Sequence, residues 1–111
     1  MSDLPPPPAS FLRFADRYPE LAAAWETTAR AGQHGPLDPT TARLVKLGVA
    51  IGALREGSVH ASVRKALAKG ITAEELHQVV ALAAGTIGFP ATVAVHTWIH
   101  DVVDAADKDQ S

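Results

Sequence analysis

Glu56 and His60 have the residue types and the spacing that suit acid–base chemistry. Residues four apart in a helix lie side by side, and a carboxylate beside an imidazole orients the ring for proton transfer. The same arrangement also occurs as an ordinary exposed pair near a helix start, where the helix dipole favours Glu. The pair therefore predicts either a general acid–base site or a surface ion pair.

His96 and His100 form a second pair at the same spacing. Two histidines on one helical face can clamp a divalent metal ion, but a third ligand is needed to complete a site. His60 and Glu56 would supply it only if the fold brought them near His96, and otherwise the two histidines face solvent. We expect no cofactor, with a divalent metal at His96 and His100 as the alternative.

The composition excludes several classes of function. The 111 residues include no cysteine, which removes disulfides, thiolate metal sites and thiol redox chemistry. The formal net charge is −2 and no basic block stands out, so nucleic acid is not an expected partner. The N-terminus lacks a signal-peptide pattern, and no uncharged apolar run reaches the roughly 18 residues that span a bilayer. We expect a soluble cytoplasmic protein without a membrane partner.

The elements that must position these residues are predicted to be helices. Apolar residues make up 47% of the chain and aromatic residues only 5%, and frequent Ala, Val and Leu favour close helix packing over a sheet. The expected fold class is therefore all-α. Periodicity and start or stop signals predict about five helices, at residues 18–31, 38–54, 58–69, 72–84 and 90–105.

Local signals at the helix ends agree with this prediction. Asp38 can cap a helix whose first position is Pro39, and Thr72 with Glu75 has the spacing of a capping box. Gly70 is the residue type that commonly ends a helix. These signals fix the beginnings of two helices and the end of the one between them.

Two further features indicate packing surfaces. Gly48 and Gly52 are four apart, so they lie on one face of their helix and would let another backbone approach closely. Trp25 and Trp98 could border a ligand pocket, although large aromatic residues in a small helical protein lie more often in the core or in an interface.

A single domain is expected at residues 10–106. Before it, residues 1–9 form a Pro-rich N-terminal segment whose four consecutive prolines prefer an extended polyproline II conformation. After it, residues 107–111 form a polar tail that we expect to fray. This division leaves all candidate site residues in one helical unit.

Two segments separated by a short break carry a family pattern. They are LDPTTARLVKLGVA and ALAKGITAEELHQVVALAAGTIGFPA, which lie within residues 37–95. In order and spacing they resemble the carboxymuconolactone decarboxylase family, which includes the AhpD-like alkylhydroperoxidases. The resemblance implies an AhpD-like helical fold with a central antiparallel helix pair. It also implies homo-oligomers, often trimers or hexamers.

The family's peroxidase branch has four functional positions that fall here on Arg43, Arg55, Ser58 and Ser62. In that branch they are a glutamate, two cysteines and a histidine, and none of the four is kept. Thiol peroxidase activity is not expected, because it needs a thiolate and a resolving thiol. With these replacements, the family's pocket would become cationic and hydroxylated, which suits a small organic anion.

Three functions follow as hypotheses. The first is a decarboxylase-like lyase acting on a small carboxylated lactone or related anion, with His60 and Glu56 as the acid–base pair and Arg43 or Arg55 as the anion holder. Ser58 and Ser62 would also bind substrate. The second hypothesis is a non-catalytic AhpD-like protein that binds a ligand or a partner. The third is a metal-dependent antioxidant protein.

Overall fold

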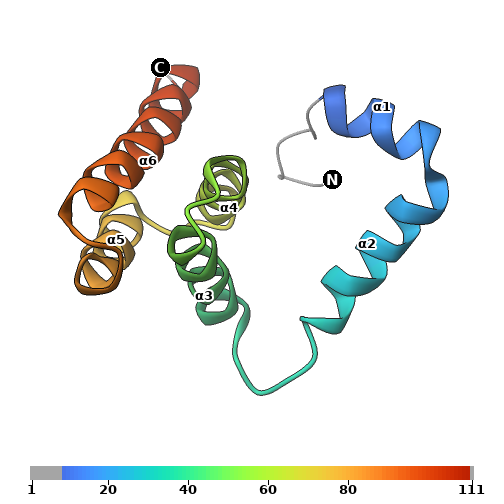
Figure 1. Cartoon of the computed structure of the whole chain (residues 1–111), viewed down its shortest axis with the longest axis horizontal. Coiled ribbons are helices and arrows are strands. Elements are labelled where there is room, and N and C mark those ends of the chain that lie inside the picture. Colours follow the sequence, from blue (N-terminus) through green and yellow to red (C-terminus); the bar gives the residue numbers. More distant parts are fainter. Residues whose placement is uncertain (1–8, 111) are drawn as a thin grey trace.

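The computed structural model describes residues 9–110, which form six α-helices joined by short loops (Figure 1). None of these residues lies in a strand, which confirms the all-α class. The count exceeds the expected five because an additional helix forms at residues 9–17. The helices are α1 (Ala9–Arg17), α2 (Pro19–Ala31), α3 (Pro39–Gly52), α4 (Glu56–Ala68), α5 (Ala73–Ile87) and α6 (Phe89–Gln110).

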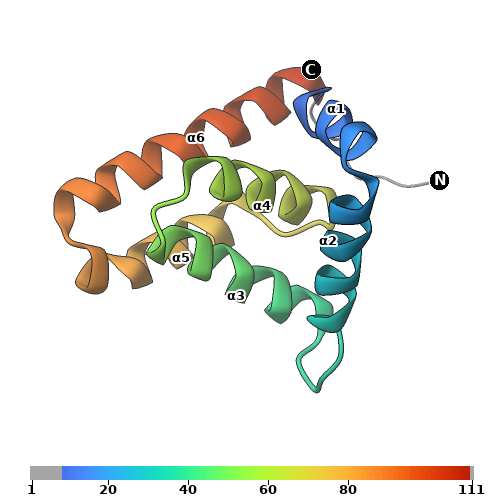
Figure 2. The same cartoon turned by 45° about the vertical axis from the view of Figure 1, so that its right-hand side comes forward.

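Helices α3 to α6 close a ring around one core. α3 packs on α4, α4 on α6, α6 on α5, and α5 on α3 (Figure 2). The antiparallel pair α3–α4 is the central pair expected for an AhpD-like fold. Buried aliphatic side chains from all four helices and from the α4–α5 loop fill the ring: Leu47, Ala50, Ile51, Val59, Val63, Ala66, Ile71, Leu76, Val80, Val95 and Ile99.

The predicted helix starts are confirmed by side-chain hydrogen bonds. The Thr41 backbone N–H donates to Asp38 Oδ1 at 2.8 Å, and this bond lowers the pKa of Asp38. The capping box at α5 is complete: the Glu75 N–H donates to Thr72 Oγ1 at 3.1 Å, and the Thr72 N–H donates to Glu75 Oε1 at 3.0 Å. The Thr72 N–H bond lowers the pKa of Glu75.

After α3 and after α4, the chain passes through a residue with a left-handed backbone conformation. Gly70 has a φ of 87°, and the Ile71 N–H reaches back to the Ala66 carbonyl at 3.1 Å, as predicted for a glycine stop. The end of α3 uses Leu54 in the same role, with a φ of 54°. A side chain in this conformation costs roughly 1–2 kcal/mol. The turn that joins the central helix pair therefore stores strain that the α4–α5 turn avoids.

The C-terminal end of the described chain differs from the prediction. α6 continues to Gln110, so the polar tail expected to fray from residue 107 is helical. An ion pair four residues apart supports it, with Lys108 Nζ 3.1 Å from Asp104 Oδ2. The Pro-rich segment lies outside the described residues except for Ala9, which opens α1. The domain boundaries stay a prediction.

In the described part of the chain, no helix has both the length and the apolar composition needed to cross a membrane. The N-terminal helix pair, α1 and α2, stands apart from the bundle (Figure 1). Neither helix of this pair has a buried residue. The ordered core thus belongs to α3–α6 alone.

The two capping carboxylates should make the fold sensitive to acid. Their hydrogen bonds lower the pKa of Asp38 and Glu75, so both stabilise the fold above the ordinary carboxylate pKa. This stabilisation is lost as the pH falls through the lower, folded-state pKa. Asn and Gln keep the cap acceptors without titrating. In thermal melts followed by circular dichroism, Asp38→Asn/Glu75→Gln should lose less Tm on acidification than the wild type. Equal losses would contradict this.

Candidate functional site

Four basic side chains gather where the start of α3 lies beside the end of α4. We call them the cationic cluster: Arg43, Lys46, Lys65 and Lys69. Burial lowers the pKa of Lys65, and the charges of Arg43, Lys46 and Arg64 lower it further. Burial also lowers the pKa of Lys46, with added contributions from Arg43 and Lys69. The fold therefore holds like charges close enough to repel one another.

Arg43 is the most constrained member of the cationic cluster. It is half-buried, and this burial lowers the pKa of its guanidinium. Its Nε is buried without a hydrogen-bond partner. Among residues 9–110, the ion pairs are His60–Glu56 and Lys108–Asp104, and neither includes a cluster residue. A buried donor without a partner costs free energy that an acceptor would recover.

A cavity of about 470 Å³ opens beside the cationic cluster. Its walls combine α3 and the end of α4 with the loop that joins α2 to α3. The lining residues are Ala29, Gly32, Gln33, His34, Gly35, Pro36, Leu37, Pro39, Ala42, Arg43, Lys46 and Lys69. The sequence predicted Arg43 as a ligand-binding residue, and the structure places it in a cavity. The sequence analysis did not predict that Lys46, Lys69 and His34 would line the same cavity.

The other predicted anion-binding residues lie elsewhere. Arg55 is the N-cap of α4, at the opposite end of the helix pair from Arg43. The stretch of α3 from Arg43 to Gly52 alone spans about 13 Å. Ser58 is exposed, whereas Ser62 is 7% exposed and belongs to the packed face of α4. The structure thus separates Arg43 from Arg55 and does not gather the four positions into one pocket.

The predicted acid–base pair forms on α4. His60 Nε2 lies 3.9 Å from Glu56 Oε2, and the two side chains are 29% and 58% exposed. Residues two apart in a helix point about 160° away from each other, so His60 lies on the other side of α4 from Ser58 and Ser62. The side chains of His60 and Glu56 are accessible to solvent, but His60 does not share a helix face with the predicted serines.

His96 and His100 belong to a row of three imidazoles. The His96 ring centroid is 6.3 Å from that of His100 and 5.1 Å from that of His77 on α5. Within the described residues, no group of three or more His, Asp or Glu side chains is arranged to hold a metal ion. His77 was not predicted, because its proximity to α6 depends on helix packing. The metal site at His96 and His100 stays a prediction, and these two histidines are its only predicted ligands.

These features describe a small α-helical protein whose central antiparallel helix pair carries a cationic cavity. The sequence profile of the carboxymuconolactone decarboxylase family matches residues 19–101, and the chain belongs to this family. This confirms the resemblance read from the two segments of the sequence. Neither a curated protein nor a solved structure gave a significant match to the chain.

Removing one charge from the cationic cluster should stabilise the fold. The fold lowers the pKa of Lys65, so its charged form destabilises the folded state at neutral pH. Lys65→Met keeps the aliphatic stem. Exposed charge interactions are worth up to about 1 kcal/mol, so we expect Tm to rise by about 2–5 °C in calorimetry.

The matched control is Lys108→Met, which removes a lysine that pairs with Asp104 at 3.1 Å. This variant should show no rise in Tm, because the charge it removes is favourably placed. An unchanged or lower Tm for Lys65→Met would show that the cationic cluster does not strain the fold.

Proposed function

We propose that this member of the carboxymuconolactone decarboxylase family binds a small carboxylated molecule in the Arg43 cavity. The observation that carries the proposal is the buried Arg43 Nε, which has no partner and lies in a residue that lines the cavity. The other charged side chains in the lining are Lys46 and Lys69, with His34 beside them. A ligand that brings negative charge would supply what these residues lack.

The chemistry of the lining favours a carboxylate. A guanidinium offers planar, paired donors that match the two carboxylate oxygens, whereas lysine acts as a point charge. The cavity of about 470 Å³ falls within the range of small-molecule sites. A bound anion would also reduce the repulsion within the cationic cluster. Family membership supports a carboxylated lactone as the ligand class.

The first test is a thermal-shift titration with γ-butyrolactone-γ-carboxylate, using neutral γ-butyrolactone as the matched ligand control. A ligand that binds only the folded state raises Tm as its concentration exceeds Kd. We expect the carboxylate, and not the neutral lactone, to raise Tm of the wild type. Arg43→Met should abolish the shift and Arg43→Lys should retain part of it.

Arg55→Met is the matched variant control, since Arg55 is the other arginine predicted to hold the anion. It should leave the shift unchanged, because it lies at the far end of the helix pair. Loss of the shift in Arg55→Met with retention in Arg43→Met would move the anion site to the start of α4. An equal response to both lactones would overturn charge recognition.

A second candidate function is acid–base catalysis by His60 and Glu56. The 3.9 Å separation of their nearest atoms supports it, because Glu56 can orient the imidazole for proton transfer. In a decarboxylation, the bond to the carboxyl carbon breaks and CO₂ leaves. The electron pair stays on the lactone, and the His60 imidazolium donates a proton to the carbon that carries it. Arg55, adjacent in sequence to Glu56, would hold the anion.

This candidate predicts that His60→Gln abolishes CO₂ release from a carboxylated, unsaturated lactone while the variant keeps its Tm. His100→Gln, which removes an exposed histidine of α6, is the matched control and should keep full activity. A fully active His60→Gln variant would end the acid–base hypothesis. Binding without turnover in the wild type would instead identify a non-catalytic ligand-binding protein.

The metal-dependent antioxidant function is the weaker alternative. Its candidate ligands are His96 and His100, and the ring next to them is His77, whose Nδ1 is buried without a partner. Nothing else in the described geometry favours it over anion binding. We therefore rest the proposed function on the cationic cavity.

A further inference from the structure

Lys46 brings a primary amine into the lining of the cationic cavity. It follows Arg43 by three residues on α3, so the two side chains are neighbours on one helix face, with Cβ atoms about 5–6 Å apart. Both residues line the cavity, together with Lys69 from the end of α4. Lys46 is exposed, so a ligand in the cavity can reach its Nζ atom. A bound molecule would therefore meet an amine beside a guanidinium.

The surroundings of Lys46 favour the neutral, nucleophilic form of this amine. Burial lowers its pKa most, and the charges of Arg43 and Lys69 lower it further. Among the described residues that line the cavity, none is Asp or Glu. Asp38 lies between two lining residues in the sequence, but its carboxylate accepts hydrogen bonds from the backbone N–H and the hydroxyl of Thr41. Cationic neighbours of this kind make a lysine nucleophilic.

The lysine outside the cationic cluster has different surroundings. Lys108 lies near the end of α6, and its Nζ is 3.1 Å from Asp104 Oδ2. A carboxylate thus accompanies the charge of Lys108, whereas the charged neighbours of Lys46 are cations. The chain therefore contains its own reference lysine for amine chemistry.

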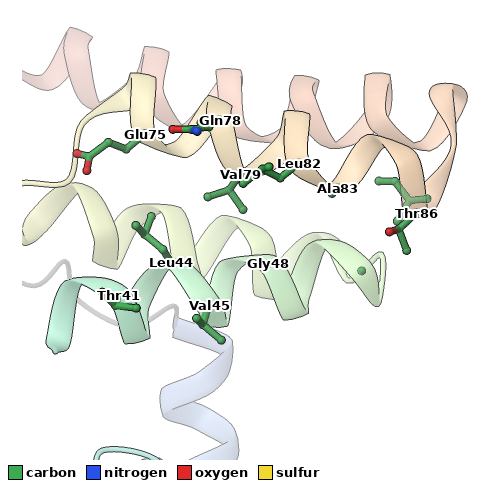
Figure 3. Close-up of a pocket in the computed structure, with 12 residues that line it drawn as sticks. Thr41, Leu44, Val45, Gly48, Glu75, Gln78, Val79, Leu82, Ala83 and Thr86 are labelled. Carbon is green, nitrogen blue, oxygen red and sulfur yellow. The ribbon is translucent and has the colours of Figure 1, made fainter. Parts of the chain in front are cut away.

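A second hollow of the structure offers no amine. It is the groove between α3 and α5, which has a volume of about 540 Å³ (Figure 3). Its walls are mainly apolar, and neither lysine nor arginine is among the described residues that line it. Glu75, which lines the groove, is held in the capping box with Thr72. Chemistry that needs a lysine in a hollow therefore belongs to the cationic cavity.

We propose that Lys46 forms an imine with a small oxo acid whose carboxylate is held by Arg43. This inference rests on the proposed anion site and adds a covalent step to it. In such an acid, the carbonyl carbon lies one or two bonds from the carboxylate. A carboxylate on Arg43 would therefore bring that carbon to the neighbouring amine of Lys46 on the same face of α3.

The step needs neither an oxidant nor a reductant. The lone pair of Nζ attacks the carbonyl carbon, and the π pair of the carbonyl moves to its oxygen. One proton passes from the nitrogen to this oxygen, which takes up a second proton and leaves as water while the protonated C=N bond forms. Histidine suits proton transfer near neutral pH, and His34 lines the same cavity.

The imine gives the bound acid a new reactivity. Its positively charged nitrogen withdraws electrons from the adjacent carbon, so a C–H bond there releases its proton more readily. The electron pair of that bond then forms the C=C bond of an enamine. Return of a proton to the carbon and hydrolysis of the imine by water regenerate the oxo acid and the free amine of Lys46.

The test traps the imine in the full chain. Pyruvate is the probe, and methyl pyruvate, which lacks the free carboxylate, is the matched neutral control. Sodium cyanoborohydride reduces the imine to a stable secondary amine, and peptide mass spectrometry reports the modification of each lysine. We expect pyruvate to label Lys46 at least about tenfold faster than Lys108, because a bound oxo acid stays beside the amine. Methyl pyruvate should lack this preference.

Exchange of the pyruvate methyl protons for deuterium in D₂O, followed by NMR, gives a second readout. Lys46→Arg is the informative variant, since a guanidinium keeps the positive charge but stays protonated. It should lose the exchange activity of the wild type and keep the Tm shift with γ-butyrolactone-γ-carboxylate. Lys108→Arg is the matched control and should exchange as fast as the wild type.

Three results would overturn the imine at Lys46. They are equal labelling of Lys46 and Lys108 by pyruvate, equally selective labelling by methyl pyruvate, and exchange at the wild-type rate in Lys46→Arg. The Tm shift separates this inference from the proposed function. A shift without a trapped imine would leave anion binding standing and refute the imine. Selective labelling of Lys46 by pyruvate without a shift would uphold the imine and exclude the lactone as the ligand.

Discussion

The small aliphatic core inside the ring of α3–α6 is the constraint on which the rest of the structure depends. Each large side chain that it buries contributes about 1.5–3 kcal/mol, and none of them comes from α1 or α2. Each bundle helix packs one face against this core, so a binding surface must lie on the remaining faces. The end of the α3–α4 pair carries the cationic cavity, and the gap between α3 and α5 carries the apolar groove.

The cationic cluster shows how this protein departs from a fold optimised only for stability. A half-buried guanidinium beside two lysines destabilises the folded state, and a hydrophobic or acidic residue at position 43 would not. The resemblance to the family implies that its peroxidase branch has a glutamate at this position. Arg43 in place of that carboxylate would reverse the charge at this position.

The sequence was most informative where a structure depends on a few adjacent residues. Asp38 with Thr41 and Thr72 with Glu75 are complete caps within one helical turn, so both could be predicted. The separation of His60 from Ser62 could also have been predicted, because it follows from helical rotation alone. The proximity of Lys65 and Lys69 to Arg43 could not be predicted, because it depends on which helix ends lie side by side in the fold. The exposure of Trp25 could not be predicted either, because an apolar helix face in a sequence does not show whether the rest of the chain covers it.

The order of contacts around the ring has a consequence for folding speed. α3 with α4 and α5 with α6 are neighbours both in sequence and in space, and each pair is joined by a short turn. Such local pairs close small loops at low entropic cost, and helical proteins built from them fold in microseconds to milliseconds. Leu54, held in the left-handed conformation, sits in the turn that closes the first of these pairs. Leu54 lines neither the cavity nor the groove, so the turn that joins the central pair lies outside both.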